Sequence, residues 1–333
     1  MVTIRDIARE ANVSIATVSH VLNGTREVAL TTRTTVLDVM EKRAYQPSAL
    51  GRNLRRRSSH MIGVIVSDIT SPFFSAVSKA AEETARQRGY YTMVCNTNED
   101  VAQERQYLGV LSQQLVDGFI ISPCVGNHEH LVRLAADRKP VVVFNRAVAV
   151  ETPTLVMDNE GVAYDLTMRL VGAGFQRIWV MAGLREASTT QLRVEGHQRA
   201  LRAAGIAYDP GRVLYTARTF ESGYAAGRVA LATEPCDAFL TFNTPIAEGV
   251  LHALTQTEHA GRPALAGFDI PSWASLLALP YICNAASPVS EFGTKAVTVL
   301  LDWIEKGVTP PQRTEQLSVR ITSSDTRANS AHA

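Results

Sequence analysis

The beginning of the chain carries apolar residues at helical spacing. Thr3 and Asp6 resemble a capping box, with Asp in place of the usual Glu, which predicts that a helix starts there. The sequence Asn12-Val13 interrupts the pattern, so this first helix is predicted to be short. The apolar positions recur at intervals of three and four and form one helical face: Ile4, Ile7, Ala8 and Ala11.

A second short helix is predicted to follow directly. Ser14 is suited to cap its start, and Asn23-Gly24 is suited to end it. A third helix is expected from about Thr32 to Ala44. Two short helices joined by a tight turn and followed by a third form a helix-turn-helix arrangement. We therefore expect a helix-turn-helix DNA-binding domain over residues 1–46.

In that arrangement the start of the second helix enters the major groove. Ile15, Ala16 and His20 lie off the predicted apolar face and are the candidate base readers. His20 can donate to guanine, whereas Ile15 and Ala16 offer only apolar contacts, for instance to a thymine methyl group. Short polar side chains are better suited to phosphates: Ser14, Thr17, Ser19 and Asn23. Thr3 is a further candidate for DNA binding. On periodicity alone, a helical packing module that binds no nucleic acid is an equal alternative.

The charge distribution favours the DNA-binding alternative. Residues 1–60 carry ten Lys and Arg against five Asp and Glu, a balance of +5, although the whole chain is only +1. A basic head on a mildly acidic body indicates a polyanionic partner for the head. Residues 47–60 are predicted to be a hinge helix or linker, with Ser48 as N-cap, Arg55 among the arginines, and Leu54 as a wedge for the minor groove. The alternative is a solvated basic linker.

The rest of the chain alternates apolar runs with helical segments. Continuous apolar runs are typical of buried parallel strands, and two successive series of them predict two doubly wound α/β lobes over residues 61–326. The first series comprises residues 62–66, 91–95, 118–122 and 141–144, and the second 178–181, 213–215, 239–242 and 264–268. Residues 327–333 are expected to be a disordered tail without leucine heptads.

The head resembles that of the LacI/GalR family of repressors. The segments that carry the resemblance are residues 3–8, 16–23 and 45–49, together with Leu54. The resemblance covers nearly the whole chain. It implies a homodimer on a pseudo-palindromic double-stranded operator, with Leu54 as the minor-groove leucine, and a body similar to periplasmic sugar-binding proteins. It also implies three chain crossings between lobes, which we expect to divide as 61–160 plus 288–326 and 161–287.

The carboxyl ends of parallel strands nominate an effector pocket, since ligands of such folds bind there. Arg193 lies in a segment that matches the ligand-binding arginine of the family, and Phe220 matches an aromatic residue that often covers the ligand. On the residues alone, ordinary loop polarity or core packing would explain each position. The candidate effector-binding residues are Phe73, Phe74, Asn145, Arg193, Phe220, Asn243 and Asp269.

Two departures from the family pattern bear on the effector. The family commonly has Asp where Asn145 stands, and Asn-Asp where Asn243-Thr244 stands. Losing carboxylates while keeping Arg193 makes the pocket less negative. We therefore favour an anionic effector, a sugar acid or sugar phosphate, over a neutral sugar, with Arg193 as a bidentate partner. The sequence leaves open whether the effector releases the operator or promotes its binding.

Other features narrow the function. Four dispersed cysteines without a CxxC pair, no apolar leader at the start and no long apolar run are expected of a cytoplasmic protein. We expect no metal, no cofactor and no enzymatic activity, since no acid–base or nucleophile motif is present. The sequence predicts an allosteric, effector-controlled transcription regulator of carbohydrate or sugar-acid metabolism, which we expect to be a repressor. The alternative is a sugar-binding or transport protein without a DNA role.

Overall fold

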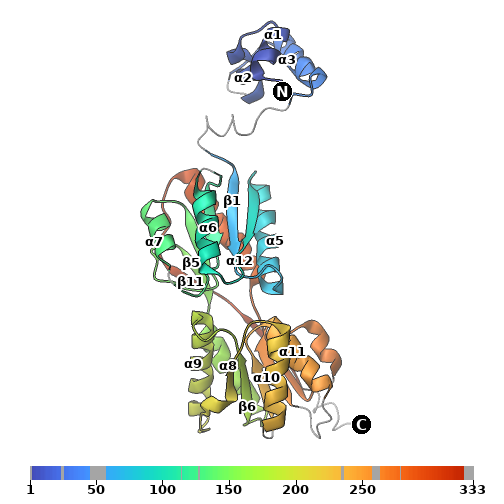
Figure 1. The fold of residues 1–333 in the computed structure, drawn as a ribbon, viewed down its shortest axis with the longest axis vertical. Coiled ribbons are helices and arrows are strands. Elements are labelled where there is room, and N and C mark those ends of the chain that lie inside the picture. The colour runs from blue at the N-terminus through green and yellow to red at the C-terminus, as the bar shows by residue number, and fades with distance from the viewer. Residues whose placement is uncertain are drawn as a thin grey trace. The chain divides into compact units, whose positions relative to one another are not determined.

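The computed structural model describes residues 2–23, 26–45, 58–113, 115–126, 128–233, 236–256, 263–277 and 279–325. The chain divides into two compact units, Met1–Ser59 and His60–Ala333. Figure 1 shows both units, and each has its own hydrophobic core. No helix in these ranges is long and apolar enough to span a membrane.

The first unit contains three helices in its described part: α1 (Ile4–Glu10), α2 (Ile15–Asn23) and α3 (Leu30–Lys42). The capping box is present, because the backbone N–H and the hydroxyl of Thr3 both donate to Oδ2 of Asp6, at 2.9 and 2.6 Å. Ser14 caps α2 as expected, accepting from the backbone N–H of Thr17 at 3.0 Å. The buried residues that hold the three helices together are Ile7, Ala8, Ala11, Val18, Val21 and Val36.

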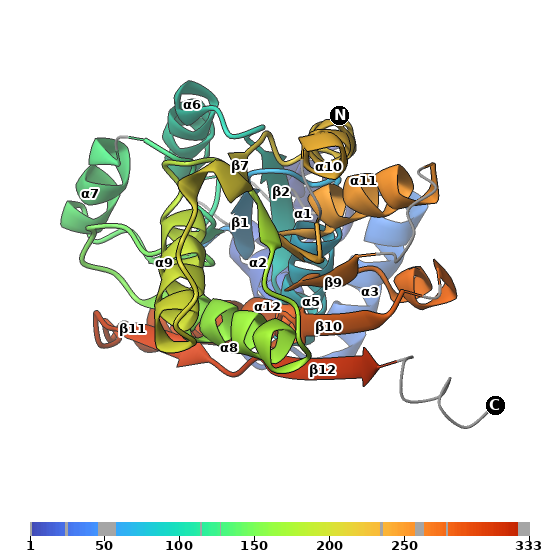
Figure 2. The same ribbon diagram turned by 90° about the horizontal axis from the view of Figure 1, so that it is seen from below.

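The first lobe of the second unit is built on a parallel six-stranded sheet in the order β11-β5-β4-β3-β1-β2. Helices α5 and α12 cover one face, and α6 and α7 cover the other, so both faces are buried (Figure 2). The elements are β1 (Met61–Val66), α5 (Pro72–Gln87), β2 (Tyr91–Asn96), α6 (Val101–Ser112), β3 (Gly118–Ile121), α7 (Glu129–Ala136), β4 (Val141–Phe144), β5 (Thr154–Met157), α12 (Val289–Lys306) and β11 (Thr314–Leu317).

The second lobe repeats the design with the sheet order β12-β10-β9-β8-β6-β7, in which only β12 is antiparallel. Helices α8 and α9 cover one face, and α10 and α11 cover the other. The elements are α8 (Asn159–Gly172), β6 (Ile178–Ala182), α9 (Ser188–Ala203), the 3₁₀ helix η1 (Pro210–Arg212), β7 (Val213–Tyr215), α10 (Phe220–Thr233), β8 (Ala238–Thr241), α11 (Thr244–Thr255), β9 (Ala264–Phe268), η2 (Ser272–Leu277), β10 (Tyr281–Ala286) and β12 (Arg320–Asp325).

The fold class expected from the sequence is confirmed, but one lobe assignment is wrong. The chain crosses between lobes after β5, after β10 and again after β11. The expected first lobe included all of residues 288–326. Instead, β12 pairs antiparallel with β10, from Tyr281–Asp325 to Ala286–Arg320, and completes the second sheet. Because the body begins in the first lobe, a third crossing necessarily ends in the second lobe.

A buried histidine joins two helices of the second lobe. His197 of α9 is 2% exposed, and its Nδ1 lies 3.1 Å from the hydroxyl of Thr167 on α8. That hydroxyl donates to the carbonyl of Ala163, so it is placed to accept from the ring. Burial lowers the pKa of His197 to about 4 from the ordinary 6.5, because the imidazolium would lose its hydration.

This pKa predicts acid sensitivity. Between pH 6.5 and 4 the unfolded chain takes up a proton at His197 that the folded chain does not, so stability falls as pH drops through this window. We expect His197 alone to remove about 2 kcal/mol between about pH 7 and about pH 5. Urea unfolding followed by tryptophan fluorescence at both pH values measures this loss.

The matched variants are His197→Gln and, at an exposed position of the same lobe, His252→Gln. The pH-dependent loss should shrink by that amount in His197→Gln and stay unchanged in His252→Gln. Equal losses in wild type and His197→Gln would contradict the assignment.

Candidate functional site

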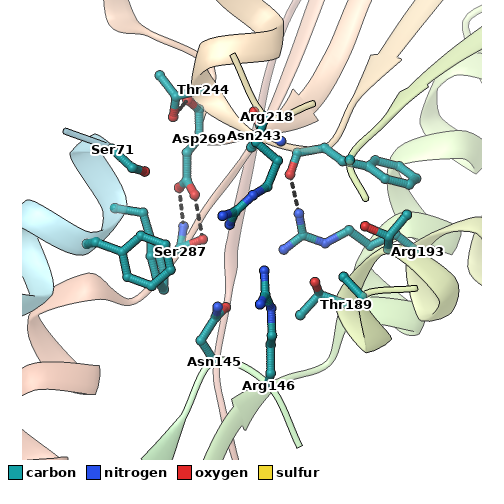
Figure 3. Close-up of a pocket in the computed structure, with 16 residues that line it drawn as sticks. Ser71, Asn145, Arg146, Thr189, Arg193, Arg218, Asn243, Thr244, Asp269 and Ser287 are labelled. Atoms are coloured by element: carbon teal, nitrogen blue, oxygen red, sulfur yellow. Dashed lines mark hydrogen bonds between the residues drawn. The ribbon is translucent and has the colours of Figure 1, made fainter. Parts of the chain in front are cut away.

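A cavity lies where the carboxyl ends of the two sheets face one another. Its empty space is about 610 Å³, including the part that is open to solvent (Figure 3). The first lobe contributes Ser71, Phe73, Phe74, Asn145 and Arg146, and Ser287 comes from the second crossing between lobes. The second lobe contributes Gly183, Ala187, Thr189, Thr190, Arg193, Arg218, Phe242, Asn243, Thr244 and Asp269.

Arg193 is a buried cation of the cavity, 8% exposed. Its Nε donates to Oδ1 of Asn159 at 2.8 Å, and its Nη1 donates to the carbonyl of Phe242. The guanidinium carbon lies 3.7 Å from the ring centroid of Phe268, so the group is stacked as well as hydrogen-bonded. Burial lowers the pKa of Arg193 to about 9, an effect that the nearby Asp269 opposes. The side chain is therefore still cationic near neutral pH and is fixed in one orientation.

Asp269 is the carboxylate that lines the cavity. It follows β9 with a left-handed backbone, φ +53°, and accepts from both the backbone N–H and the hydroxyl of Ser287 at 2.7 Å. Burial raises the pKa of Asp269, whereas Ser287 and Arg193 act in the opposite direction. Because Ser287 lies between β10 and α12, these bonds tie the carboxylate to a crossing between the lobes.

Two asparagines present amide groups at the cavity. Asn145 follows β4, also with a left-handed backbone of φ +69°, and its Nδ2 donates to the hydroxyl of Ser122 at 3.1 Å. Its Oδ1 is therefore the group available to a ligand. Asn243 caps α11, accepting from the backbone N–H of Ile246 at 3.1 Å. This cap leaves its Nδ2 as a donor. Left-handed residues at strand ends are typical of functional sites, where a side chain must be turned toward a ligand.

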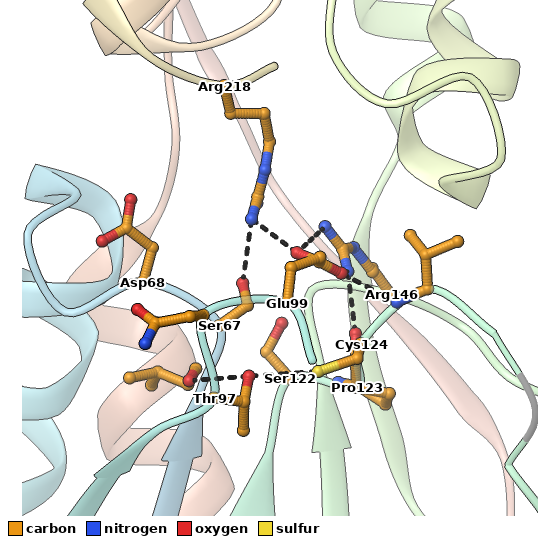
Figure 4. Close-up of polar contacts among 12 residues, drawn as sticks. Ser67, Asp68, Thr97, Glu99, Ser122, Pro123, Cys124, Arg146 and Arg218 are labelled. Carbon is orange, nitrogen blue, oxygen red and sulfur yellow. Dashed lines mark hydrogen bonds and ion pairs between the residues drawn. The ribbon is translucent and has the colours of Figure 1, made fainter. Parts of the chain in front are cut away.

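A charged cluster lies beside the cavity, where the lobes meet (Figure 4). Glu99 accepts from Arg146 of its own lobe and from Nη2 of Arg218 of the other lobe, the latter at 2.5 Å. Arg146 is 4% exposed and also donates to the carbonyl of Pro123 at 2.8 Å. Both arginines line the cavity, so its wall carries three guanidinium groups and one carboxylate.

The structure brings six of the seven predicted effector residues together: Phe73, Phe74, Asn145, Arg193, Asn243 and Asp269. Phe220, the seventh, is not among the residues that line the cavity. Phe220 is 40% exposed at the start of α10 and packs against His252 of α11, with ring centroids 5.6 Å apart. Its role in covering the ligand therefore stays a prediction.

Sequence reasoning missed Arg218, Thr189, Thr190 and Ser287. The strand-end rule that selected the other residues also applies to Arg218, which lies three residues beyond β7. Nothing comparable marks Ser287, because its role depends on the second crossing passing next to Asp269. Across the described ranges, no group of three or more His, Cys, Asp or Glu side chains is arranged to hold a metal ion.

The first unit presents the predicted DNA-binding residues at and near the start of α2. Ile15 is 44% exposed although it is apolar, and Ala16 is exposed beside it, while His20 is half-buried one turn later. The hydroxyls of Ser14 and Thr17 lie 2.8 Å apart. Asn23 ends α2. Ser48, Leu54 and Arg55, and the tail of residues 327–333, lie outside the described residues.

Comparison with known proteins covers both units. Residues 3–48 match the model of bacterial regulatory proteins of the lacI family. Residues 59–331 match the model of periplasmic binding proteins and the sugar-binding domain of the LacI family. The ribose operon repressor of Escherichia coli K12 is 31% identical over 320 residues, 94% of this chain and 96% of that protein. Catabolite control protein A of Priestia megaterium is 29% identical over 314 residues, 92% of each chain.

Solved structures show the same fold. The Lac repressor bound to ONPG in its repressed state is similar with a TM-score of 0.83 and 22% identity, over 96% of this chain and 98% of that one. The regulator CelR in complex with cellobiose is similar with a TM-score of 0.70 and 24% identity, over 97% and 98%. The relatives named above are regulators of transcription rather than enzymes. The chain therefore belongs to the LacI family and is a DNA-binding transcription regulator with an effector-binding body.

Proposed function

We propose that this regulator responds to a small anionic, hydroxylated effector, a sugar acid or a sugar phosphate, bound between its lobes. The observation that carries the proposal is the charge of the cavity wall, which has three guanidinium groups and one carboxylate, Asp269. A second carboxylate, Glu99, pairs with two of the guanidinium groups, so three positive charges meet two negative ones and the balance is +1. Donors outnumber acceptors, since Arg193, Arg218 and the amide of Asn243 offer N–H groups. A ligand that fits this wall is rich in acceptor oxygens, as carboxylates and phosphates are.

Arg193 is suited to hold the acid group. Its Nε and one Nη1 hydrogen are used by Asn159 and Phe242, so the Nη2 end remains for the ligand. A guanidinium that is already oriented loses little conformational entropy when it binds a carboxylate or phosphate. The sugar hydroxyls would then meet Asp269, which keeps acceptor capacity beside Ser287, and Phe73 or Phe74, whose rings suit the apolar face of a sugar.

For the head we propose that Ile15, Ala16 and His20 read base edges in the major groove. Thr3, Ser14, Thr17 and Asn23, with Ser48 and Arg55 of the hinge, would contact phosphates, and Leu54 would enter the minor groove. The protein would act as a homodimeric repressor on a pseudo-palindromic operator in the cytoplasm. Four buried free cysteines are consistent with a reducing compartment. Effector and operator must alter each other's affinity by the same factor.

The effector class is tested by calorimetry with D-gluconate, D-gluconate 6-phosphate and neutral D-glucose. We expect an acid to bind at least about tenfold more tightly than the neutral sugar, since a hydrogen bond to a charged group contributes about 1.5–3 kcal/mol. Arg193→Met should remove this preference, because the acid loses its cationic partner.

The control is Arg202→Met, which removes an exposed arginine from α9, the helix that carries Arg193. It should leave the preference intact. Tight binding of the neutral sugar alone would overturn the proposed effector class.

Base reading by His20 is tested by His20→Ala. We expect operator affinity to fall by about 1–3 kcal/mol, or roughly 5- to 150-fold, while affinity for a scrambled duplex stays unchanged. Fluorescence anisotropy of both duplexes at one fixed salt concentration measures the two affinities. Thr34→Ala, at an exposed position of α3, is the control and should change neither. A parallel loss on both duplexes would show that His20 contacts only the backbone.

The wedge role of Leu54 is tested in the same assay. Leu54→Ala should weaken binding to the operator far more than binding to the scrambled duplex, because only a correctly docked hinge gains from unstacking a base step. An equal loss on the two duplexes would refute the wedge.

A further inference from the structure

Glu99 is held at the meeting point of the lobes by three donors. Its carboxylate accepts from Arg146 through both terminal nitrogens of that guanidinium and from the backbone N–H of Val125 at 2.7 Å. The third donor, Nη2 of Arg218, belongs to the second lobe and lies 2.5 Å from Oε2 (Figure 4). The Glu99–Arg218 ion pair therefore joins the two lobes directly.

The backbone at Glu99 adopts an unusual conformation. Asn98 and Glu99 are both left-handed, with φ of +51° and +63°. Asn adopts this region with some ease, but Glu does so rarely and at a conformational cost. The turn between β2 and α6 therefore has a conformational cost, and in this conformation the Glu99 carboxylate contacts Arg146 and Arg218.

Arg218 faces both the cluster and the cavity. Its Nη2 is used by Glu99 and approaches the hydroxyl of Ser67 at 3.4 Å. Its Nε and Nη1 have no hydrogen-bond partner in the part of the chain that the structure describes, and the residue lines the cavity beside Gly183 (Figure 3). One edge of the guanidinium is thus committed to the first lobe, and another is available to a ligand.

The cluster carries more positive than negative charge. Two guanidiniums share the one carboxylate of Glu99, in a place where Arg146 is 4% exposed and Arg218 is only partly exposed. Asp68 raises the pKa of Arg218 through its charge, but its hydrogen bonds lie in its own loop, where its Oδ1 accepts from the backbone and the hydroxyl of Thr70. Desolvation and the like charge of Arg146 both lower the pKa of Arg218. Bringing the lobes together therefore costs Arg146–Arg218 repulsion as well as forming the Glu99 pair.

We propose that Arg218 is a specificity-determining residue that reads the charge of the effector and couples it to lobe closure. This inference rests on the proposed anionic effector. The ligand's acid group, held by the Nη2 end of Arg193, also binds the free edge of Arg218, while Nη2 of Arg218 keeps its bond to Glu99. Two guanidiniums then face two anions, so the excess positive charge is neutralised and the closed arrangement is stabilised. A neutral sugar leaves that charge in place and closes the lobes less.

The test measures the distance between lobes in the full-length protein. Ala136→Cys in α7 and Ala203→Cys in α9 place two dyes on exposed positions, one in each lobe. The four native cysteines are buried, and burial raises the pKa of Cys124 and Cys236 to about 12 and of Cys283 to about 11, so they compete poorly for thiol-reactive dyes. Single-molecule energy transfer then reports the distribution of open and closed lobes.

The first arm uses no ligand. Glu99→Gln and Arg218→Met each remove one member of the cross-lobe pair, and both should shift the distribution toward larger separations. Glu160→Gln is the matched control, because Glu160 pairs with Arg199 at 2.6 Å within the second lobe. It should behave as wild type. If Glu99→Gln and Arg218→Met also behave as wild type while retaining normal circular dichroism, the cross-lobe role is overturned.

The second arm adds D-gluconate, D-glucose or inorganic phosphate. The acid and phosphate should close the wild-type lobes and fail to close those of Arg218→Met, whose preference for acid over glucose should drop at least about tenfold. Arg218→Lys, which keeps the charge, should restore part of the closure. Closure of Arg218→Met by acid to the wild-type extent would refute charge reading but leave the anionic effector standing. The absence of acid binding to wild type by calorimetry would instead overturn the proposed effector class.

Discussion

The direction of parallel strands is the constraint on which the rest of this body depends. Because every parallel strand of a lobe ends at the same edge, the loops after β1, β4, β6, β7, β8 and β9 must meet where the lobes face each other. Polar side chains in those loops are then concentrated in one cavity without any long-range signal in the sequence. The left-handed backbones of Asn145 and Asp269 make the final adjustment that turns the side chains inward.

Much of this arrangement could be predicted from residue order. Buried strands are recognisable in the sequence as apolar runs, and the first polar residue after a run marks the end of the strand. This rule identifies Asn145, Asn243 and Asp269. The helices of the head were equally readable, because Thr3 and Ser14 cap them locally. These features depend on neighbours within a few positions, so a single sequence contains them.

The failures share a different origin. The resemblance to the family suggests Phe220 as a cover for the ligand, whereas in the structure its ring packs against His252 of α11. Glu99, Ser287 and the position of β12 depend on which segments meet after the chain has crossed between lobes. Such contacts join residues more than a hundred positions apart, as Glu99 and Arg218 are, or depend on the order of crossings. The local sequence pattern does not encode that order. The charge balance of the cavity is therefore only partly predictable from the sequence, because Glu99 and Arg218 come together only in the fold.

The position of β12 also limits which segments of this protein can be exchanged with those of its relatives to make a chimera. A contiguous fragment spanning residues 158–286 contains most of the second lobe but lacks the strand that pairs with β10 along residues 281–286. Its sheet would end in a row of unpaired backbone groups, which invites edge-to-edge association. A chimera that exchanges ligand specificity between relatives would therefore have to carry residues 320–325 with the lobe. In this fold the segment that carries ligand specificity is discontinuous, because the second lobe includes β12, which follows in sequence after the return to the first lobe.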